Sequence, residues 1–440
     1  MKYGKNSIIR IIYFVFLTVI YFGILKYYNF VLNTPAYGIF ILIIFFYYLA
    51  NILNFYNHTY TLKETIYSLI INFLFFTIFY FFRKEKEIIY IYLIYSVLQV
   101  LLKYIFNLFS QKVENLIIID SGEYTEKLID ILKNNKDYKY LGYVGKENRI
   151  EENYLGKIEN IEITIKDRSV DVVLFTSRKQ AKEHADLLLS LKMRGIKLID
   201  YISFIEWNEG KIDIEKIDSL WFLMTDGFDA LNNAFNKRMK RMLDILASFM
   251  LLIFFLPFII LTYILVKLDI GMKYLFINPI KILKNPAFFK QKRIGKNGKE
   301  FEIIKFRSMK IHDPQKFSKY ASENDDRITL VGKFIRKTRL DELPQLLNIL
   351  KGEMSFVGPR PEWNELGREY EKKIKNYKAR YAVQPGLTGW AQVMYTYGAS
   401  LEDAKVKLEY DLYYIKHQSF ILDIIIFFKT CKIVVFGKGR

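Results

Sequence analysis

Four apolar stretches dominate the N-terminal part of the chain and limit its folds more than any other feature. They cover about residues 11–25, 36–55, 66–82 and 88–109. Each is close to the ~20 apolar residues that a helix needs to cross a bilayer. No small-residue cleavage site follows the first stretch and the second comes at once, so we expect a retained span and not a signal peptide. The sequence therefore predicts a four-helix transmembrane bundle over residues 1–112.

The next segment, residues 113–205, consists of short apolar strands that alternate with polar helices. Strands are expected at 116–120, 138–144, 170–176 and 196–202, and helices at 123–132 and 179–193. This alternation is typical of an α/β domain with a parallel sheet. The turn at 120–123, Asp-Ser-Gly-Glu, has one glycine where a dinucleotide site has G-x-G-x-x-G. We therefore predict a degenerate Rossmann-like domain that acts as a spacer or in self-association as a homodimer, and not in nucleotide binding.

A fifth apolar stretch, residues 242–266, follows a predicted linker at 206–235. Basic residues flank both of its ends, which favours a cytoplasmic location for both. Pro257 lies near its middle, where a proline removes a backbone donor and can break the helix into two arms. The alternative is a fifth crossing, which would place the rest of the chain on the opposite side of the membrane from the α/β domain. We therefore predict a re-entrant helix that enters one leaflet and returns to the same face.

Charge and composition narrow the chemistry. The net charge of +19 suits a surface that lies against anionic lipid or binds phosphorylated ligands. It would also suit nucleic acid, but no basic and aromatic readout module is recognisable, so no nucleic-acid partner is expected. Cys431 is the single cysteine, which excludes an intramolecular disulfide and a cysteine-cluster metal site. Because the four histidines are widely scattered, any catalysis is expected to rest on carboxylates.

The adjacent carboxylates Asp341 and Glu342 are the strongest candidates for that role. Pro344 suits the first turn of a helix, which places the pair at or just before a helix N-terminus. There the helix dipole and the free N–H groups stabilise ionised carboxylates, so depressed pKa values are expected. An ionised carboxylate serves as a nucleophile or as a metal ligand. Helix capping alone would also explain an isolated Asp-Glu pair.

Three turn-forming segments surround this pair in the sequence. Gly-Lys-Asn-Gly at 295–298 predicts a basic hairpin turn, because Asn-Gly favours positive φ. Gly-Pro-Arg-Pro at 358–361 holds Arg360 between two prolines, which restrict its backbone. Arg360 therefore loses little conformational entropy when its guanidinium binds a ligand. The segment 384–393 has two glycines that allow close backbone approach. Together with the basic residues nearby, these loops indicate a phosphate site.

From about Lys237 to Gly439 the sequence resembles the bacterial sugar transferases, or polyprenyl-phosphate sugar-1-phosphate transferases. The segments that carry the likeness include Lys-Phe-Arg-Ser-Met and Leu-Asp-Glu-Leu-Pro-Gln, and they lie in order at 285–298, 301–309, 324–329, 340–345, 351–361 and 385–390. Four spans and an α/β domain ahead of this part are similar to the large members of the family. Those members initiate O-antigen, capsule or exopolysaccharide synthesis.

The resemblance implies a mostly α, monotopic catalytic domain over 236–440, on the cytoplasmic face of the bacterial inner membrane. It implies transfer of a sugar 1-phosphate from a UDP-sugar to undecaprenyl phosphate, with release of UMP. Asp341 would be the nucleophile, forming a phosphosugar-aspartate intermediate, and Glu342 would bind a Mg²⁺ cofactor. The residues expected to bind phosphate or substrate are Arg360, Arg339, Lys305, Arg307 and Gln392.

Two other functions are weighed against this one. A membrane-anchored nucleotide-sugar dehydratase would need a glycine-rich dinucleotide turn, and the glycines here never occur as G-x-x-G-x-x-G. A non-catalytic membrane scaffold of polysaccharide assembly would use the α/β domain for self-association. Formation of a labelled sugar-diphospholipid by membranes would separate an enzyme from a scaffold.

Overall fold

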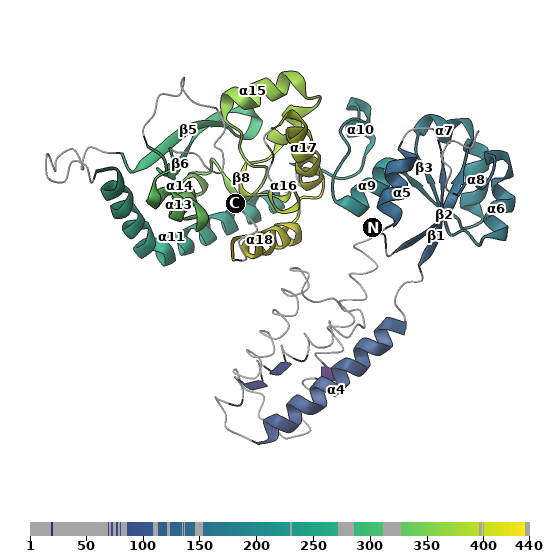
Figure 1. The fold of residues 1–440 in the computed structure, drawn as a ribbon, viewed down its shortest axis with the longest axis horizontal. Helices are drawn as coiled ribbons and strands as arrows, with labels where there is room; N and C mark the ends of the chain where they lie inside the picture. The colour runs from purple at the N-terminus through teal and green to yellow at the C-terminus, as the bar shows by residue number, and fades with distance from the viewer. Residues whose placement is uncertain are drawn as a thin grey trace. The chain divides into compact units, whose positions relative to one another are not determined.

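The fold of the 440-residue chain is described by a computed structural model (Figure 1). It divides into two compact units, Met1–Glu209 and Gly210–Arg440. The finer division predicted from the sequence stays a prediction. The structure describes residues 19–20, 69, 72–73, 76–77, 80, 86–108, 113–120, 124–133, 135, 137–145, 153–228, 231–271, 286–310, 327–395, 398 and 400–435.

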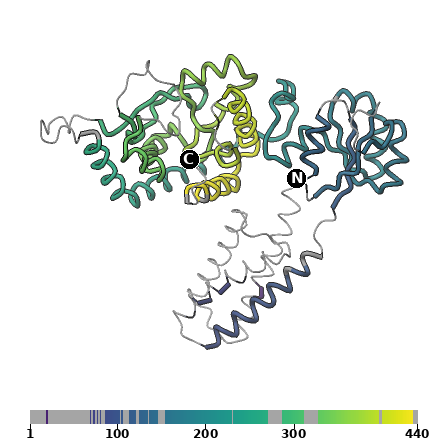
Figure 2. The backbone as a smooth tube through the Cα atoms, in the orientation of Figure 1, coloured from purple at the N-terminus to yellow at the C-terminus, as the bar shows by residue number. Residues whose placement is uncertain are grey.

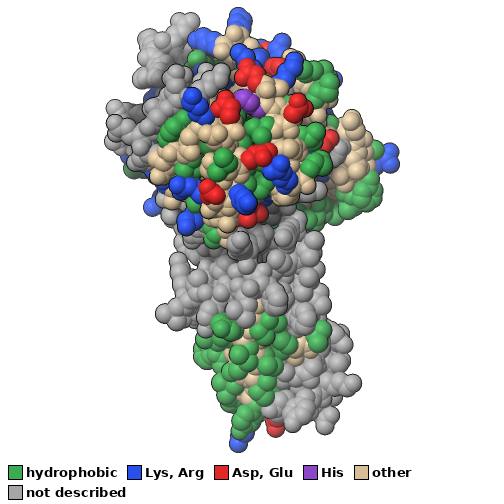
Figure 3. All heavy atoms as spheres, turned by 90° about the vertical axis from the view of Figure 1, so that its right-hand side faces the viewer, with side chains coloured by type: hydrophobic (Ala, Val, Ile, Leu, Met, Phe, Trp, Pro, Cys, Tyr) green, Lys and Arg blue, Asp and Glu red, His purple; other side chains and the backbone are tan. Residues whose placement is uncertain are grey.

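The fourth predicted span forms helix α4, Glu87–Leu108. One side of α4 is buried, and there Asn72 of the preceding apolar stretch donates to Gln99 Oε1 at 2.7 Å and to Ser96 Oγ at 3.1 Å. The opposite side carries exposed apolar side chains, visible in green in Figure 3. A polar seam between helices with an apolar outer face fits a helix that faces lipid. The first two predicted spans lie outside the described residues apart from 19–20, so the four-helix bundle stays a prediction.

A four-stranded parallel sheet follows α4. Its strands, in the spatial order β2-β1-β3-β4, are β1 Glu114–Ile119, β2 Tyr138–Val144, β3 Val172–Phe175 and β4 Lys197–Asp200. The helices between and after them are α5 Thr125–Lys133, η1 Ile158–Asn160, α6 Ile161–Asp167, α7 Arg178–Glu183, α8 Ala185–Met193 and α9 Tyr201–Glu209. The predicted α/β alternation is confirmed. Residues 121–123 of the predicted turn lie outside the described ranges.

Successive residues of β1 face opposite sides of this sheet, and both sides are buried. Leu116 and Ile118 belong to an apolar cluster that includes residues of α5 and α9. Ile117 and Ile119 belong to a second cluster, with residues of α6 and α8. A parallel sheet covered on both faces has strands that are continuous apolar runs. The Leu-Ile-Ile-Ile run of β1 is recognisable in the sequence for this reason.

Two elements of the sheet domain differ from their predicted bounds. The predicted helix 179–193 is divided into α7 and α8, because His184 leaves the helical conformation (φ −117°, ψ 30°). The predicted strand 196–202 ends at Asp200, whose Oδ1 accepts a hydrogen bond from the backbone N–H of Ser203 at 3.1 Å. Such a bond satisfies a free N–H group at a helix start, so α9 begins where the strand was expected to continue.

The second unit contains α10, Ser219–Met224, and the long helix α11, Ala234–Gly271. Among the described residues, one helix is long and apolar enough to cross a membrane, and it lies within α11 at Ala234–Asp269. α11 stays helical through Pro257, so the two predicted arms are joined within one bent helix, and the re-entrant path stays a prediction. A proline removes one backbone hydrogen bond and crowds the preceding turn, which bends a helix and leaves its other bonds in place. Figures 1 and 2 show that α11 changes direction part-way along its length.

A hairpin comes next in the described chain. β5, Phe288–Ile294, pairs antiparallel with β6, Glu300–Phe306, around the short turn η4, Lys296–Gly298. Asn297 and Gly298 both have positive φ, of 57° and 73°. The predicted Asn-Gly hairpin turn is therefore confirmed.

The rest of the second unit is mostly helical. Its elements are α13 Leu330–Lys337, η6 Leu340–Glu342, α14 Gln345–Lys351, β7 Ser355–Val357, α15 Asn364–Lys373, η7 Tyr377–Ala382, β8 Gly386–Thr388, α16 Trp390–Met394, α17 Leu401–Lys416 and α18 Phe420–Val435. β7 and β8 pair in parallel. This pairing brings the segment after β7 beside the segment around β8, although some thirty residues of chain separate them.

Polar residues near the start of α11 bind the helix to this part of the unit. Arg241 donates to two backbone carbonyls at the end of α14, at 2.5 and 2.6 Å. Asp244, which is buried, accepts from a hydroxyl and a backbone N–H of β7, at 3.1 and 3.0 Å. A long apolar helix is thereby fixed to the two elements that flank the predicted site segments.

Asn348, which is fully buried, joins α14 to β6. Its Oδ1 accepts from the backbone N–H of Ile304 at 3.1 Å, and its Nδ2 donates to the backbone carbonyl of Glu302 at 2.7 Å. These bonds satisfy a backbone N–H and a backbone carbonyl of β6 on the side of the strand that is not paired with β5. A buried backbone group without a partner costs free energy, so one side chain holds the two elements in register.

We expect Asn348→Ala to lower the free energy of unfolding by about 2–3 kcal/mol, because it leaves buried strand groups unsatisfied. Thermal unfolding of the detergent-solubilised protein measures the change. The control is Asn364→Ala at the start of α15, because the Asn364 side chain has no hydrogen bond to another described residue and its removal should change stability by less than about 0.5 kcal/mol. Equal effects of the two substitutions would contradict the assigned role of Asn348.

Candidate active site

Asp341 and Glu342 lie in the short helix η6, between α13 and α14. Arg339, just before η6, has a left-handed backbone (φ 59°), which is uncommon for a residue with a side chain. This conformation turns the chain after α13. Pro344 then precedes the first residue of α14. The prediction that the two carboxylates stand just before a helix start is confirmed.

Glu342 is the centre of a largely buried cluster of charges, in which its side chain is 13% exposed. Its Oε1 accepts from Arg360 NH2 at 2.8 Å and from Lys305 Nζ at 3.2 Å. Burial alone would raise the pKa of Glu342, but the positive charges of Arg360 and Lys305 outweigh it and hold the pKa well below its ordinary value. Glu342 is therefore ionised at any physiological pH.

The environment of Asp341 acts in the opposite direction. Burial, followed by the negative charge of Glu342, raises the pKa of Asp341 to about 6, although Lys305 and two arginines oppose the shift. The predicted depression of this pKa is therefore wrong. Loss of water destabilises the ionised form of Asp341 more than a helix start can stabilise it, and α14 has only seven residues. Asp341 is the more basic of the two carboxylates and remains mainly ionised above pH 6.

Arg360 is held in position by close backbone contacts. The backbone N–H of Gly358 donates to the Thr388 carbonyl at 2.9 Å, and that of Gly386 donates to the Pro359 carbonyl at 2.9 Å. A Cβ added at Gly386 or at Gly389 would overlap the backbone of Gly358. The predicted close approach at these glycines is confirmed, and it fixes the loop that carries Arg360.

The other predicted site residues fall into two groups. Arg339 is near enough for its charge to lower the pKa of both carboxylates. Arg307 and Gln392 have no contact with either carboxylate among the described residues. Each has a buried polar atom without a hydrogen-bond partner in that part of the chain, NH1 of Arg307 and Oε1 of Gln392. Such atoms are suited to a ligand that satisfies them.

Two arginines near the site were missed in the sequence. Arg336 of α13 donates through Nε to Ser308 Oγ at 2.7 Å, and its charge opposes the raised pKa of Asp341. Its position less than two helical turns before Asp341 is a signal that could have identified it. Arg380 is buried and donates to the backbone carbonyl of Arg360 at 3.0 Å. No spacing in the sequence indicates that contact.

The carboxylates also bear on metal binding. Within the described ranges, no group of three or more His, Cys, Asp or Glu side chains is placed to hold a metal ion. Mg²⁺ is commonly bound through one or two protein carboxylates together with substrate phosphates and water. Glu342 fits that small donor set, because Lys305 and Arg360 both bind its Oε1 and neither binds its Oε2.

Comparison with known proteins matches the part of the chain that contains this site. The sequence pattern of the family described as bacterial sugar transferase matches residues 235–437. An exopolysaccharide production protein of Rhizobium leguminosarum is 39% identical over 199 residues, which are 44% of this chain and 92% of that protein. The chain belongs to the bacterial sugar transferase family.

Two longer members of the family are also similar to the chain. The UDP-N-acetylgalactosamine-undecaprenyl-phosphate N-acetylgalactosaminephosphotransferase of Aeromonas hydrophila is 42% identical over 200 residues, 46% of this chain and 44% of that protein. The UDP-glucose:undecaprenyl-phosphate glucose-1-phosphate transferase of Escherichia coli K12 is 38% identical over 205 residues, 46% of this chain and 41% of that protein. The chain thus matches less than half the length of these two relatives. The family match over 235–437 includes every predicted site residue.

We expect Glu342→Gln to lower the free energy of unfolding by about 3 kcal/mol, because Lys305 and Arg360 are left largely buried without their negative partner. Unfolding in detergent at neutral pH measures the loss. The matched control is Glu302→Gln, whose pair with Lys290 is more than half exposed and should contribute less than about 1 kcal/mol. A stability unchanged by Glu342→Gln would show that the cluster does not depend on that charge.

Proposed function

We propose that the chain transfers a sugar 1-phosphate from a UDP-sugar to undecaprenyl phosphate and releases UMP. The observation that carries the proposal is the pair Asp341 and Glu342, which lies beside the cations Lys305 and Arg360. The pKa of Asp341 is raised, whereas that of Glu342 is lowered, so Glu342 is ionised at any physiological pH. The names of the relatives from Aeromonas hydrophila and Escherichia coli K12 describe transfers of this kind for those proteins. The family match covers the same residues here.

Asp341 is the proposed nucleophile in the first step. One of its carboxylate oxygens attacks the β-phosphorus of the UDP-sugar and forms a new P–O bond. The bond from that phosphorus to the oxygen bridging the two phosphates breaks, and its electron pair leaves with UMP. A pKa of about 6 keeps Asp341 mainly ionised at neutral pH while making it a stronger base than an ordinary aspartate.

The second step returns Asp341 to its starting state. An oxygen of undecaprenyl phosphate attacks the phosphorus held on Asp341, and the P–O bond to the carboxylate breaks with its electron pair. The product is an undecaprenyl diphosphate sugar. A covalent phosphosugar-aspartate intermediate lets a soluble donor and a lipid acceptor use one site in turn.

The neighbouring groups would offset the charge of the diphosphate. Arg360 presents a planar fork that matches phosphate oxygens, and Lys305 supplies a compact charge. Arg339, Arg307 and Gln392 are proposed as further contacts to the substrate. A Mg²⁺ ion held by Glu342 and the substrate phosphates would supply neutralisation of the charge that develops on the leaving phosphate.

The proposed location is the bacterial inner membrane, with the catalytic part on the cytoplasmic face, where UDP-sugars are available. α11 supports a membrane attachment for this unit, since it is apolar over most of its length and largely exposed. Its bend is compatible with a re-entrant path. The proposed pathway is the first membrane step of O-antigen, capsule or exopolysaccharide synthesis.

We expect Asp341→Asn to abolish UMP release, because an amide cannot attack phosphorus, while the protein stays folded in the membrane. Purified protein is assayed with a panel of UDP-sugars and undecaprenyl phosphate, and a sugar-labelled donor is used to trap the intermediate on the wild type. Asp226→Asn, in the loop before α11, is the control and should retain activity. Near-normal turnover by Asp341→Asn would exclude Asp341 as nucleophile, and a wild type without product would favour a scaffold.

Removal of divalent cations should stop the reaction if Glu342 and the substrate phosphates hold Mg²⁺. Excess EDTA is expected to abolish UMP release, and added Mg²⁺ to restore it. The effect of EDTA on thermal unfolding in the absence of substrate is measured in parallel, to separate loss of catalysis from loss of fold. Full activity in excess EDTA is the result that would refute the cofactor assignment.

Both ends of α11 are expected on the cytoplasmic face. Single cysteines at Lys237 and at Lys273, introduced separately in a Cys431→Ser background, are labelled with an impermeant maleimide in intact cells and in inverted vesicles. Labelling of both in inverted vesicles alone is the expected result. Labelling of Lys273→Cys in intact cells would mean that α11 crosses the bilayer, contrary to the re-entrant path.

A further inference from the structure

Arg380 of η7 lies in the interior of the second unit, with 4% of its side chain exposed. Its NH2 pairs with Asp411 Oδ2 of α17 at 2.8 Å and donates to the Arg360 carbonyl at 3.0 Å. Its NH1 lies 3.5 Å from Glu362 Oε1 and donates to the hydroxyl of Tyr377. One guanidinium thus connects η7, α17 and the loop after β7.

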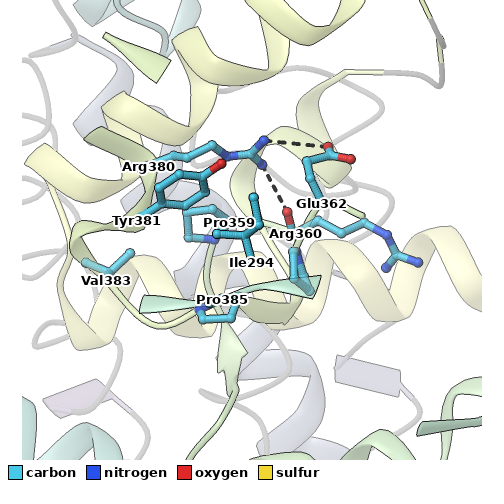
Figure 4. A pocket seen from close by; sticks show the side chains of 10 residues that line it. Ile294, Pro359, Arg360, Glu362, Arg380, Tyr381, Val383 and Pro385 are labelled. Atoms are coloured by element: carbon cyan, nitrogen blue, oxygen red, sulfur yellow. Dashed lines mark hydrogen bonds and ion pairs between the residues drawn. The ribbon is translucent and has the colours of Figure 1, made fainter. Parts of the chain in front are cut away.

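Figure 4 shows how Arg380 faces Arg360 and Glu362. Arg380 reaches the backbone of Arg360 and the carboxylate of Glu362, while the Arg360 side chain points away from it. The guanidinium of Arg360 pairs with Glu342. Arg360 is therefore held at two points, by Arg380 at its backbone and by Glu342 at its side chain.

We propose that Arg380, held by Asp411, is a positioning residue that fixes the direction in which Arg360 meets Glu342 and the substrate. This inference rests on the proposed function, and it assigns Arg380 no contact with the reacting atoms. The flanking prolines Pro359 and Pro361 restrict the backbone conformations open to Arg360. The hydrogen bond from Arg380 sets the orientation of the peptide group that contains the Arg360 carbonyl. A shift of that peptide would move the guanidinium at the end of the side chain.

The energetics of burial favour this role over a purely stabilising one. Asp411 has 1% of its side chain exposed, so both charges of the pair with Arg380 are removed from water. Buried ion pairs are often no more stabilising than apolar residues of the same volume. Unlike apolar residues, the pair provides a hydrogen-bond donor, the Arg380 guanidinium, that is held in a fixed direction toward the Arg360 carbonyl. Lysine cannot replace it, because a single ammonium lacks the planar fork that reaches Asp411, Tyr377 and the carbonyl together.

A double-mutant cycle tests the coupling. We expect Arg380→Lys to lower kcat/KM by about 10- to 100-fold, since small misplacements of a catalytic group cost rates of that order. Arg360→Lys is expected to cost at least as much. If Arg380 acts through Arg360, adding Arg380→Lys to Arg360→Lys should cost less than about threefold more. If Arg380 only stabilised the fold, the fold-losses of kcat/KM from the two substitutions would multiply.

The matched control is Arg241→Lys, combined with Arg360→Lys in the same way. Arg241 also donates to two backbone carbonyls through its guanidinium, but those carbonyls belong to α14 and not to the Arg360 loop. We expect the fold-loss of kcat/KM caused by Arg241→Lys to multiply with the fold-loss caused by Arg360→Lys. Asp411→Asn provides a second cycle that keeps the shape of the site and removes the charge that holds Arg380.

The outcomes separate the two proposals. Thermal unfolding of each purified variant shows whether it is folded, and Asp411→Asn replaces Arg380→Lys in the cycle if the latter fails to fold. Multiplied losses for Arg380 or Asp411 in an active enzyme overturn the positioning role and leave the proposed function intact. A wild type that releases no UMP from any UDP-sugar overturns the proposed function itself, and with it the positioning role.

Discussion

The ion pairs of the largely buried Glu342 are the interaction on which the rest of the site depends. An ion that loses its water needs partners in good geometry, and here they come from β6 and from the loop after β7. The surrounding fold holds those partners in reach. Asn348 joins β6 to α14, and the glycine contacts beside β8 fix the loop that carries Arg360. The site is thus assembled by tertiary contacts, not by one local motif.

Two carboxylates that are neighbours in sequence acquire opposite properties from this arrangement. Glu342 receives both cations and stays charged, whereas Asp341 is buried beside that negative charge and has its pKa raised to about 6. Glu342, which stays ionised, and Asp341, which is the stronger base, together suit attack on a phosphorus atom that carries negatively charged oxygens. The separation of roles comes from the partners of each carboxylate and not from helix capping.

Local patterns in the sequence predict much of this fold, and distant contacts account for what they miss. The apolar run of β1 and the Asn-Gly turn after β5 are recognisable because strand burial and positive φ leave signatures within a few residues. The break at His184 was missed because a single non-helical residue leaves no change in periodicity. The raised pKa of Asp341 depends mainly on its burial in the folded unit, and the pair of Arg380 with Asp411 joins residues far apart along the chain, so no spacing records either.

The hydrogen bonds of Arg241 and Asp244 also connect the site to the bilayer in the proposed location. They fix α14 and β7 to the first turns of α11, so the depth of that helix sets the height of Asp341 and Arg360 above the lipid phosphates. Lipids of different chain length would change the fit between the apolar part of α11 and the hydrocarbon layer. A change in the depth of insertion would then act on the carboxylates through those bonds, and the thickness of one leaflet would become a variable of catalysis.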